Sequence, residues 1–569
     1  MTVPPAEVVD VAIVGSGFGG SVAALRLSEK GYRVLVLEAG RRFADADHAK
    51  TSWNLPRFLW APRLGWYGIQ RIHRLPDVVL LAGAGVGGGS LNYANTLYRP
   101  PPVFYRSGSW AGAADWETEL KPHYDMAERM LGVVVNPCRG PVEDAMRATA
   151  EALGVGHTFH PTPVGVFFGA AAGQGTAAPG EQAADPFFGG QGPARRACTQ
   201  CGNCMVGCRV GAKNTLLKNY LALAERLGAR IEALRTVTRI ERLPVAGGEV
   251  DGVGDANDAN RASDAAPRWR VTHQRTGAPG LGALWRDTQV VLARHVVMAA
   301  GAWGTAKLLH RMRATGTLPD LPAALGTLTR TNSEALLGTV ATAVPAGQDL
   351  SRGVAITTSF HPDADTHVEN CRYGAGSNAM ALLSGMLVDG GGSIPRWLRA
   401  LGRAVRHPGQ ALRSRWIYRW SERAVVGLVM QTRDNSLTVS PVRRFGSWGL
   451  TSRPGHGEPN PTWIPAGYRA VRLLAEELRQ RVGTPTDVFG SVGDAFNVPM
   501  TAHFLGGCPI GTDLATSVLD HRQQVWGHPG LFVLDGSAIS ANLGVNPSLT
   551  ITAQAERAMA LWPDRSTSD

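Results

Sequence analysis

The stretch "VVDVAIVGSGFGGSVAALRLSEKGYRVLVLEAG" near the start of the chain places the strongest constraint on the fold. Its first residues, 8–14, form an apolar and largely β-branched run, which predicts a buried strand followed by a glycine turn, a helix and a second strand. Gly15, Gly17 and Gly20 occupy the glycine positions of a G-x-G-x-x-G turn. In that turn the glycines permit the tight bend, the approach of backbone to a pyrophosphate, and close helix–strand packing. The stretch therefore predicts a dinucleotide-binding βαβ unit.

Further glycine-containing segments predict that the dinucleotide is wrapped by distant parts of the chain. Glu38 ends the second strand, where a carboxylate can bind ribose hydroxyls, so a glycine turn without a ligand is disfavoured. The segments "GAGVGGGSLNYANTLYRP", "HVVMAAGAWGTAKLL" and "LFVLDGSAI" have the same strand-and-turn character. FAD, which is long, suits such a composite site better than a nicotinamide. The candidate cofactor-binding residues of these segments are Gly15, Gly17, Phe18, Gly20, Glu38, Gly83, Gly88, Gly301, Asp535 and Gly536.

The size and charge of the chain exclude several classes of protein. At 569 residues, two to four domain-sized units are expected. A net charge of +11 favours anionic surfaces in general, but no nucleic-acid-binding motif accompanies it, and no nucleic acid is expected as a partner. No run of about eighteen apolar residues predicts a membrane-spanning helix, and no signal peptide is evident. We therefore predict a cytoplasmic protein, soluble or peripheral to a membrane.

Four of the seven cysteines form a compact run, "CTQCGNCMVGC". Cys198, Cys201, Cys204 and Cys208 have the C-x2-C-x2-C-x3-C spacing with which bacterial ferredoxins bind an iron–sulfur cluster, although Arg209 stands where ferredoxins have proline. Zinc is usually bound by two separated pairs of cysteines. Thiols that stay reduced or pair locally are the third interpretation. No metal site is predicted, and the four cysteines remain candidates for a cluster.

The segments "TAHFLGG", "GVGGGSLNYAN", "GAKNTLLKNYL" and "LFVLDGSAISANLGVNPSLTITAQAE" resemble those of the glucose-methanol-choline (GMC) oxidoreductases, and within them the cholesterol oxidase branch that binds FAD non-covalently. The resemblance runs essentially from end to end. It implies an α/β fold in which a Rossmann-like FAD-binding domain carries an inserted α+β substrate-binding domain. It also implies an FAD-binding region at 1–320, which contains the cysteine segment, a substrate-binding region at 321–490, and a C-terminal return at 491–569.

The resemblance also implies three catalytic residues. His503 matches the active-site histidine of the family, and Asn546 matches its partner. A histidine with a pKa near 6.5 can accept a hydroxyl proton, and an asparagine amide can donate a hydrogen bond to the same oxygen. Glu422, in "WSERAVVGLVMQ", matches a glutamate that moves a proton between two carbons of the steroid. Taken singly, His503 could instead be a surface or core histidine whose hydrogen bonds are satisfied. Asn546 could be a turn residue before Pro547, and Glu422 an ordinary charged residue at the edge of a strand.

For the flavin, the resemblance adds Val237, on a strand expected near the adenine, and Asn546 again. Many family members have Asn-Gly shortly after "GGGS". This chain has "LNYAN" there, so either Asn92 or Asn95 is expected to reach the flavin.

The activity implied by the resemblance is oxidation of a 3β-hydroxysteroid such as cholesterol to the 3-ketosteroid. Hydride passes to FAD, O2 is reduced to H2O2, and a shift of the Δ5 double bond to Δ4 can follow. Three alternatives stay open. They are a dehydrogenase of another bulky secondary alcohol with a non-oxygen acceptor, a flavoprotein that relays electrons through an iron–sulfur cluster, and a non-enzymatic sterol carrier. The sequence does not predict an oligomeric state.

Two stretches, 51–75 and 395–420, are rich in both aromatic residues and arginine. Tryptophan and arginine together can lie in a lipid headgroup layer, and a sterol oxidase takes its substrate from a membrane. Alternatively, the aromatic rings cover the core or the substrate cavity while the arginines face water. We expect weak, peripheral membrane contact.

Overall fold

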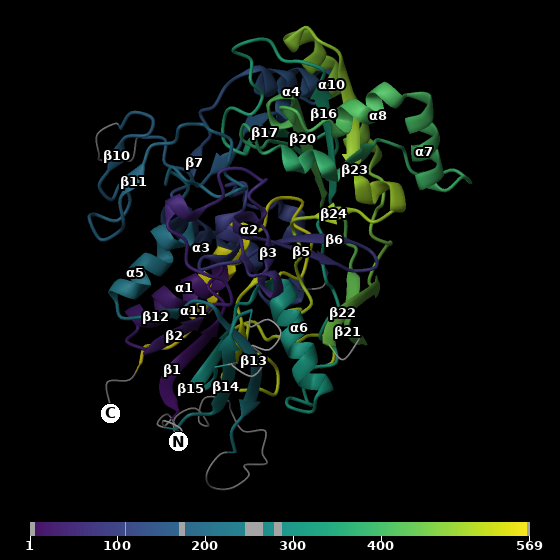
Figure 1. Cartoon of the computed structure of the whole chain (residues 1–569). Helices are drawn as coiled ribbons and strands as arrows, with labels where there is room; N and C mark the ends of the chain where they lie inside the picture. The colour runs from purple at the N-terminus through teal and green to yellow at the C-terminus, as the bar shows by residue number, and fades with distance from the viewer. Residues whose placement is uncertain are drawn as a thin grey trace.

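The computed structural model describes residues 6–108, 110–169, 177–244, 266–277, 287–444 and 447–565. Two large sheets dominate it, with the N-terminal sheet at the bottom of Figure 1 and the second sheet at the top. None of the helices within the described ranges combines the length and the hydrophobicity that crossing a bilayer requires. The predicted α/β class is confirmed.

The N-terminal sheet is built around β1, whose residues from Val9 to Val14 are buried. β1 pairs in parallel with β2 and with β15, as expected for a strand that is apolar on both faces. The strand order is β12 (Arg230–Glu232), β2 (Val34–Leu37), β1 (Glu7–Val14), β15 (Thr288–Met298), β14 (Trp269–Arg275) and β13 (Arg235–Arg242), and β25 (Leu531–Val533) also pairs with β15.

Helices from both ends of the chain pack against this sheet in one core. They include α1 (Phe18–Glu29), α3 (Trp116–Leu131), α5 (Tyr220–Arg226) and α11 (Ser548–Ala560). An ion pair joins Arg26 of α1 to Glu556 of α11, at 2.8 Å. α6 (Gly301–Ala314) begins directly after β15 and contacts β13. The FAD-binding unit therefore draws on the beginning, middle and end of the chain.

The second sheet has the strand order β19 (Ser384–Met386), β23 (Thr486–Ser491), β16 (Ala335–Ala341), β20 (Ala424–Gln431), β18 (Thr366–Cys371), β17 (Ile356–Phe360) and β8 (His160–Pro161). α4 (Pro141–Ala152) and α10 (Pro465–Val482) pack together in its core. α4 and β8 thus join this sheet although they precede residue 320. The domain boundaries at 320 and 490 stay a prediction.

Smaller elements surround the two sheets. They are α2 (Leu55–Phe58), β3 (Trp60–Ala61), β4 (Trp66–Tyr67), β5 (Gln70–Arg74), β6 (Val79–Gly83), β7 (Val134–Val135), β9 (Pro163–Val164), β10 (Gln182–Ala183), β11 (Arg195–Arg196), α7 (Arg396–Arg406), α8 (Pro408–Arg415), α9 (Trp420–Arg423), β21 (Leu437–Arg444), β22 (Ser447–Pro454) and β24 (Met500–Thr501). β5, β6 and β24 form a small sheet of their own. In Figure 1, α7 and α8 lie at the outer edge of the second sheet.

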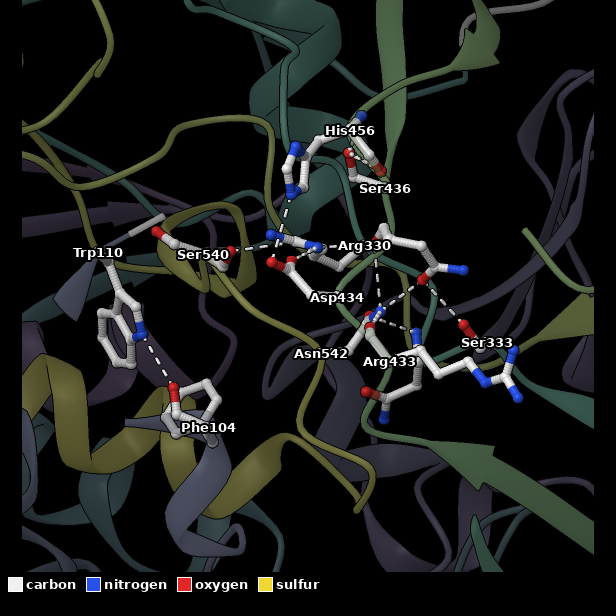
Figure 2. A network of polar contacts seen from close by, with 12 residues as sticks. Phe104, Trp110, Arg330, Ser333, Arg433, Asp434, Ser436, His456, Ser540 and Asn542 are labelled. Atoms are coloured by element: carbon white, nitrogen blue, oxygen red, sulfur yellow. Dashed lines mark hydrogen bonds and ion pairs between the residues drawn. The ribbon is translucent and has the colours of Figure 1, made fainter. Parts of the chain in front are cut away.

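A buried arginine ties together the segments that meet between the sheets (Figure 2). Arg330 donates to the backbone oxygen of Ser540 at 3.1 Å and to a carboxylate oxygen of Asp434 at 2.8 Å. Asn542 donates to the side-chain oxygen of Asn435 at 2.9 Å. This network connects the start of β16, the segment after β20 and the C-terminal return. It therefore holds in place the loops that carry the residues described next.

Candidate active site

A cavity of about 1020 Å³ lies between the two sheets. Its volume slightly exceeds the range of 300–1000 Å³ that is usual for small-ligand sites. The predicted residues that line it are Gly15, Gly17, Phe18, Glu38, Gly83, Gly88, Asn92, Val237, Gly301, His503, Asp535, Gly536 and Asn546. Residues that are far apart in sequence are thus brought together around one space.

One end of this cavity is a cradle of backbone formed by two glycine turns. Gly15 has φ +101°, and a Cβ there would overlap the backbone oxygen of Ala299. A Cβ on Gly88 would stand 2.7 Å from the Cα of Gly17. The first turn of α1 follows directly, so its free N–H groups lie beside the cradle. These features fit the pyrophosphate of a dinucleotide.

Glu38 lies at the end of β2, on the wall of this cradle. Its Oε2 accepts hydrogen bonds from the backbone N–H and the hydroxyl of Ser16, at 3.0 and 2.8 Å, and its Oε1 accepts one from the N–H of Gly40 at 2.7 Å. The carboxylate is therefore held in one orientation, with the remaining lone pairs available to a ribose hydroxyl. The donors and the glycine cradle together fit FAD.

Three predicted residues are not among the described residues that line the cavity. Gly20 packs against the glycine turn instead: a Cβ there would overlap the backbone oxygen of Gly15. Close packing of helix on strand is the role expected of the third glycine. Asn95 is fully buried and lies beside Cys204, whereas Asn92 lines the cavity and donates to Gln70 at 3.0 Å. Of the two asparagines, Asn92 is thus the one that faces the cofactor space.

Glu422 is the third of these residues, and the structure does not bring it to the cavity. Trp420, two positions earlier in the short helix α9, lines the cavity. Side chains two positions apart on a helix point in nearly opposite directions. Glu422 accordingly accepts a hydrogen bond from Ser421 at 2.9 Å and lies 3.5 Å from Arg419. The sequence comparison placed this carboxylate correctly before a strand but could not define the direction of its side chain.

His503 and Asn546 meet on the cavity wall. The Nδ2 atom of Asn546 lies 3.5 Å from the Nε2 atom of His503. The other ring nitrogen, Nδ1, lies 2.9 Å from Oε2 of Glu334, which stands at the entry to β16. Glu334 is fixed by the hydroxyl of Thr501, at 2.6 Å. A hydroxyl group placed against Nε2 and the Asn546 amide would face a proton acceptor and a hydrogen-bond donor.

The sequence analysis missed two glutamates of this site, Glu334 and Glu369. Glu369 lies in the fully buried strand β18, and its Oε2 accepts a hydrogen bond from Asn546 at 3.3 Å. Its Oε1 has no partner among the described residues. A carboxylate is costly to bury, but "THVENC" is mostly polar, so the sequence carried no signal that this strand is buried. Burial raises the pKa of Glu369 to about 8.

This shift predicts the pH dependence of stability in a Glu369→Gln variant. The folded state retains the Glu369 proton between the ordinary pKa of 4.5 and about 8, whereas the unfolded chain releases it. The wild type therefore loses free energy of unfolding as pH rises through this window, by up to roughly 1.4 kcal/mol per pH unit. Glutamine has no such titration. Urea unfolding at pH 5.5 and pH 8 should show the variant gaining stability relative to wild type at the higher pH. Parallel curves for the two proteins would contradict the assignment.

Comparisons with known proteins show the family of the chain. Residues 10–170 match the model of FAD dependent oxidoreductases, and residues 467–555 match the C-terminal model of GMC oxidoreductases. A cholesterol oxidase of Mycobacterium tuberculosis is 52% identical over 98% of this chain and 92% of its own length. A cholesterol oxidase of Acinetobacter baumannii is 40% identical over 98% of this chain and 95% of its own. A crystal structure of pyridoxine 4-oxidase from Mesorbium loti has the same fold, with a TM-score of 0.56 and 16% identity over 97% of this chain and 99% of that one.

The glycine cradle, the fixed Glu38 carboxylate and these matches define an FAD-dependent oxidoreductase that acts on CH–OH groups. The chain belongs to the GMC oxidoreductase family. The resemblance and the cofactor that its sequence segments implied are thereby confirmed.

Proposed function

We propose that this protein oxidises the 3β-hydroxyl group of a sterol such as cholesterol to the ketone, with FAD as hydride acceptor and O2 as the final oxidant. The observation that carries the proposal is the identity of 52% and 40%, over almost the whole chain, with two cholesterol oxidases. The sterol itself, the reduction of O2 to H2O2 and any double-bond shift are parts of this proposal.

The half of the cavity formed by the second sheet suits a rigid apolar substrate. Its lining is mostly hydrophobic and includes Leu336, Leu337, Ile356, Met380, Leu383, Trp420, Val426, Leu428 and Phe489. Burying apolar area contributes roughly 25 cal/mol per Å², so a sterol ring system would be bound mainly by this wall. The polar pair His503 and Asn546 would then select the position of the single hydroxyl.

In the proposed reaction, Nε2 of His503 accepts the hydroxyl proton of the substrate. The ring becomes positively charged, and the side chain of Glu334, 2.9 Å from Nδ1, stabilises that charge. Bound FAD supplies the acceptor for the hydride that leaves the carbinol carbon. Glu334 acts through His503 and is therefore a positioning residue.

Asn546 would hold the same substrate oxygen through its amide. Its Nδ2 also donates to Glu369 at 3.3 Å, and this contact limits rotation of the amide. Because burial raises the pKa of Glu369 to about 8, this carboxyl is mainly neutral near pH 7. The neutral carboxyl of Glu369 thus lies beside the asparagine, and the Glu334 side chain lies beside the histidine.

Oxygen consumption with cholesterol tests the proposed acceptor. The purified flavoprotein should consume O2 and produce one H2O2 per ketone formed. The alternative is a dehydrogenase of another bulky secondary alcohol. A dehydrogenase also occurs among the relatives, since one that is 25% identical is named 2-methyl-1,2-propanediol dehydrogenase. Ketone formation only with an artificial acceptor, without peroxide, would favour that alternative.

The position of Glu422 predicts the steroid products of a Glu422→Gln variant. Since Glu422 turns toward Ser421 and Arg419, it does not contact the cavity through which the steroid would exchange a proton. The variant should give the same ratio of conjugated to unconjugated ketone as the wild type, measured by chromatography after complete turnover. Accumulation of the unconjugated ketone in this variant alone would restore Glu422 as the isomerising base.

We also propose reversible contact with an anionic membrane through α7 and α8. Apolar side chains on one face of α7 are exposed, including Trp397 at 47%, Leu401 at 57% and Val405 at 72%, and exposed arginines accompany them. This pattern is typical of helices that lie in a lipid interface. α8 contacts the segment Asn378–Leu383, from which Met380 and Leu383 line the cavity.

The cytoplasmic location stays a prediction.

A Trp397→Ala, Leu401→Ala double variant tests this membrane contact. Losing two interfacial side chains should weaken binding to sterol-containing anionic vesicles about tenfold, measured by co-sedimentation at low salt. Leu227→Ala removes a comparably exposed side chain, 53%, elsewhere on the surface and should change nothing. If the wild type, the double variant and Leu227→Ala bound the vesicles equally, α7 would not be the surface that contacts the membrane. A shift in oligomeric state of the double variant would show that the face binds a second copy instead.

A further inference from the structure

The four clustered cysteines lie together in the fold, outside the cavity that binds FAD. Cys198, Cys201, Cys204 and Cys208 all line one small, separate cavity of about 20 Å³. One water molecule needs 10–15 Å³, and close-packed interiors leave few voids of this size. All four are free thiols. Four thiols therefore face one shared space inside the fold.

The loop around the cysteines is held in a single conformation. Gly202 has φ +72° and donates its N–H to Gly353, which in turn donates to Gln200 at 2.8 Å. A Cβ on Gly202 would overlap the backbone oxygen of Ser351. The N–H of Gln200 also donates to the sulfur of Cys198 at 3.3 Å, and N–H···S bonds of this kind stabilise and tune cluster thiolates. The loop conformation that brings the four thiols together is therefore fixed by these contacts.

The wall of the small cavity contains a buried lysine. Lys213 lines this cavity and is 1% exposed. Its Nζ atom donates to three backbone oxygens, those of Leu91, Tyr93 and Cys204, and no ion pair among the described residues includes Lys213. A buried cation normally requires an opposite charge nearby. A cluster held by four thiolates carries a net negative charge and would provide it.

A buried amide also points toward this group. Asn95 is fully buried and lies beside the thiol of Cys204. Apart from that thiol, neither its amide nitrogen nor its oxygen has a hydrogen-bond partner among the described residues. Asn95 is thus oriented toward the cysteines, although the sequence suggested a contact with the flavin.

A single metal ion does not explain the arrangement. No three His, Cys, Asp or Glu side chains of the described residues are grouped so that they could hold one ion. Zinc requires four ligands that converge on one point at about 2.3 Å. In a [4Fe–4S] cluster each thiolate binds a different iron atom, so the four sulfur atoms surround a space. The ferredoxin spacing and the shared void both fit that geometry.

We propose that Cys198, Cys201, Cys204 and Cys208 bind a [4Fe–4S] cluster in this cavity. The site is close to the catalytic cavity, since Met205, the residue after Cys204, lines the large cavity, as do Tyr93 and Ala94, two neighbours of Asn95. The proposal goes beyond the proposed sterol oxidation and does not depend on it.

Iron and acid-labile sulfide, measured on anaerobically purified holoenzyme, test the proposal. We expect about four of each per chain, alongside one FAD. A Cys201→Ser variant should lose at least half of the iron and sulfide. Cys138→Ser, which changes a buried cysteine of the same hydrophobic cluster outside the quartet, should keep both. FAD content shows whether each variant has folded. Should Cys201→Ser fail to fold, Cys198→Ser and Cys208→Ser, at partly exposed thiols, provide the same comparison.

Electron paramagnetic resonance of the dithionite-reduced protein gives a second readout, in which the signal of a reduced [4Fe–4S] cluster should appear in wild type and Cys138→Ser only. The proposal is overturned if FAD-loaded wild type contains neither iron nor sulfide after reconstitution with both, if zinc takes their place, or if the two variants lose iron equally.

Discussion

Replacing His503 by alanine should lower kcat/KM for cholesterol by about 10³-fold, within the range that removal of a general base produces. His503 is the only nitrogen base, among the described residues, that contacts Asn546 on the cavity wall, so the variant loses the base beside this amide. FAD should remain bound at wild-type level, because the glycine cradle is formed by other residues. Steady-state rates and flavin content of the purified variant check both statements.

Two companion variants make this prediction specific. His528→Ala removes another buried histidine that is not among the lining residues, and it should keep activity within a few-fold. Glu334→Gln should lower kcat more than KM and shift the pH profile, because it removes the charge facing Nδ1 but leaves the base in place. Activity of His503→Ala within tenfold of wild type would mean that another group accepts the proton.

Replacing Gly15 by alanine should abolish FAD binding. The residue has φ +101°, which alone costs an L-amino acid about 1–2 kcal/mol, and the new Cβ would in addition overlap the backbone oxygen of Ala299. Any relief of this overlap moves the turn that faces the cofactor. Flavin absorbance per chain after purification should fall below about a tenth of wild type, and the melting temperature should fall by several degrees.

Gly154→Ala separates backbone strain from the contact at the cradle. Gly154 has φ +76°, with nothing within 4 Å of an added Cβ, so this variant carries the conformational cost without the overlap. It should be mildly destabilised and fully loaded with FAD. If Gly15→Ala bound FAD as well as Gly154→Ala does, the first glycine turn would not be the pyrophosphate site.

The cofactor site could be predicted from the sequence because its determinants are local. Gly15, Gly17 and Glu38 belong to one βαβ unit, and their spacing alone defines the turn and its carboxylate. Glu334 and Glu369 could not be found in this way, because Glu334 precedes β16 and Glu369 lies in β18. Each acquires a role only where the second sheet meets the C-terminal return. Their relation to His503 and Asn546 is a product of tertiary structure.

The direction in which a side chain points could not be predicted from the sequence either. Glu422 was placed at the start of β20, but the single helical turn α9 directs Trp420, not Glu422, toward the cavity. Asn92 and Asn95 could not be separated by sequence, although Asn92 lines the large cavity and Asn95 lies beside Cys204. The cysteine run likewise allowed three interpretations from its spacing, and the cluster proposed above awaits its iron and sulfide measurement.

Anaerobic mixing of the FAD-loaded protein with cholesterol directly tests the proposed transfer of hydride from a sterol 3β-alcohol to the flavin. The account predicts rapid bleaching of the flavin absorbance by the 3β-alcohol, one flavin reduced per ketone formed, and no bleaching by the 3α-epimer, whose hydroxyl cannot reach His503 and Asn546 from the same ring position. Failure of cholesterol to bleach the flavin, with bleaching by a small non-steroid alcohol instead, would contradict the account.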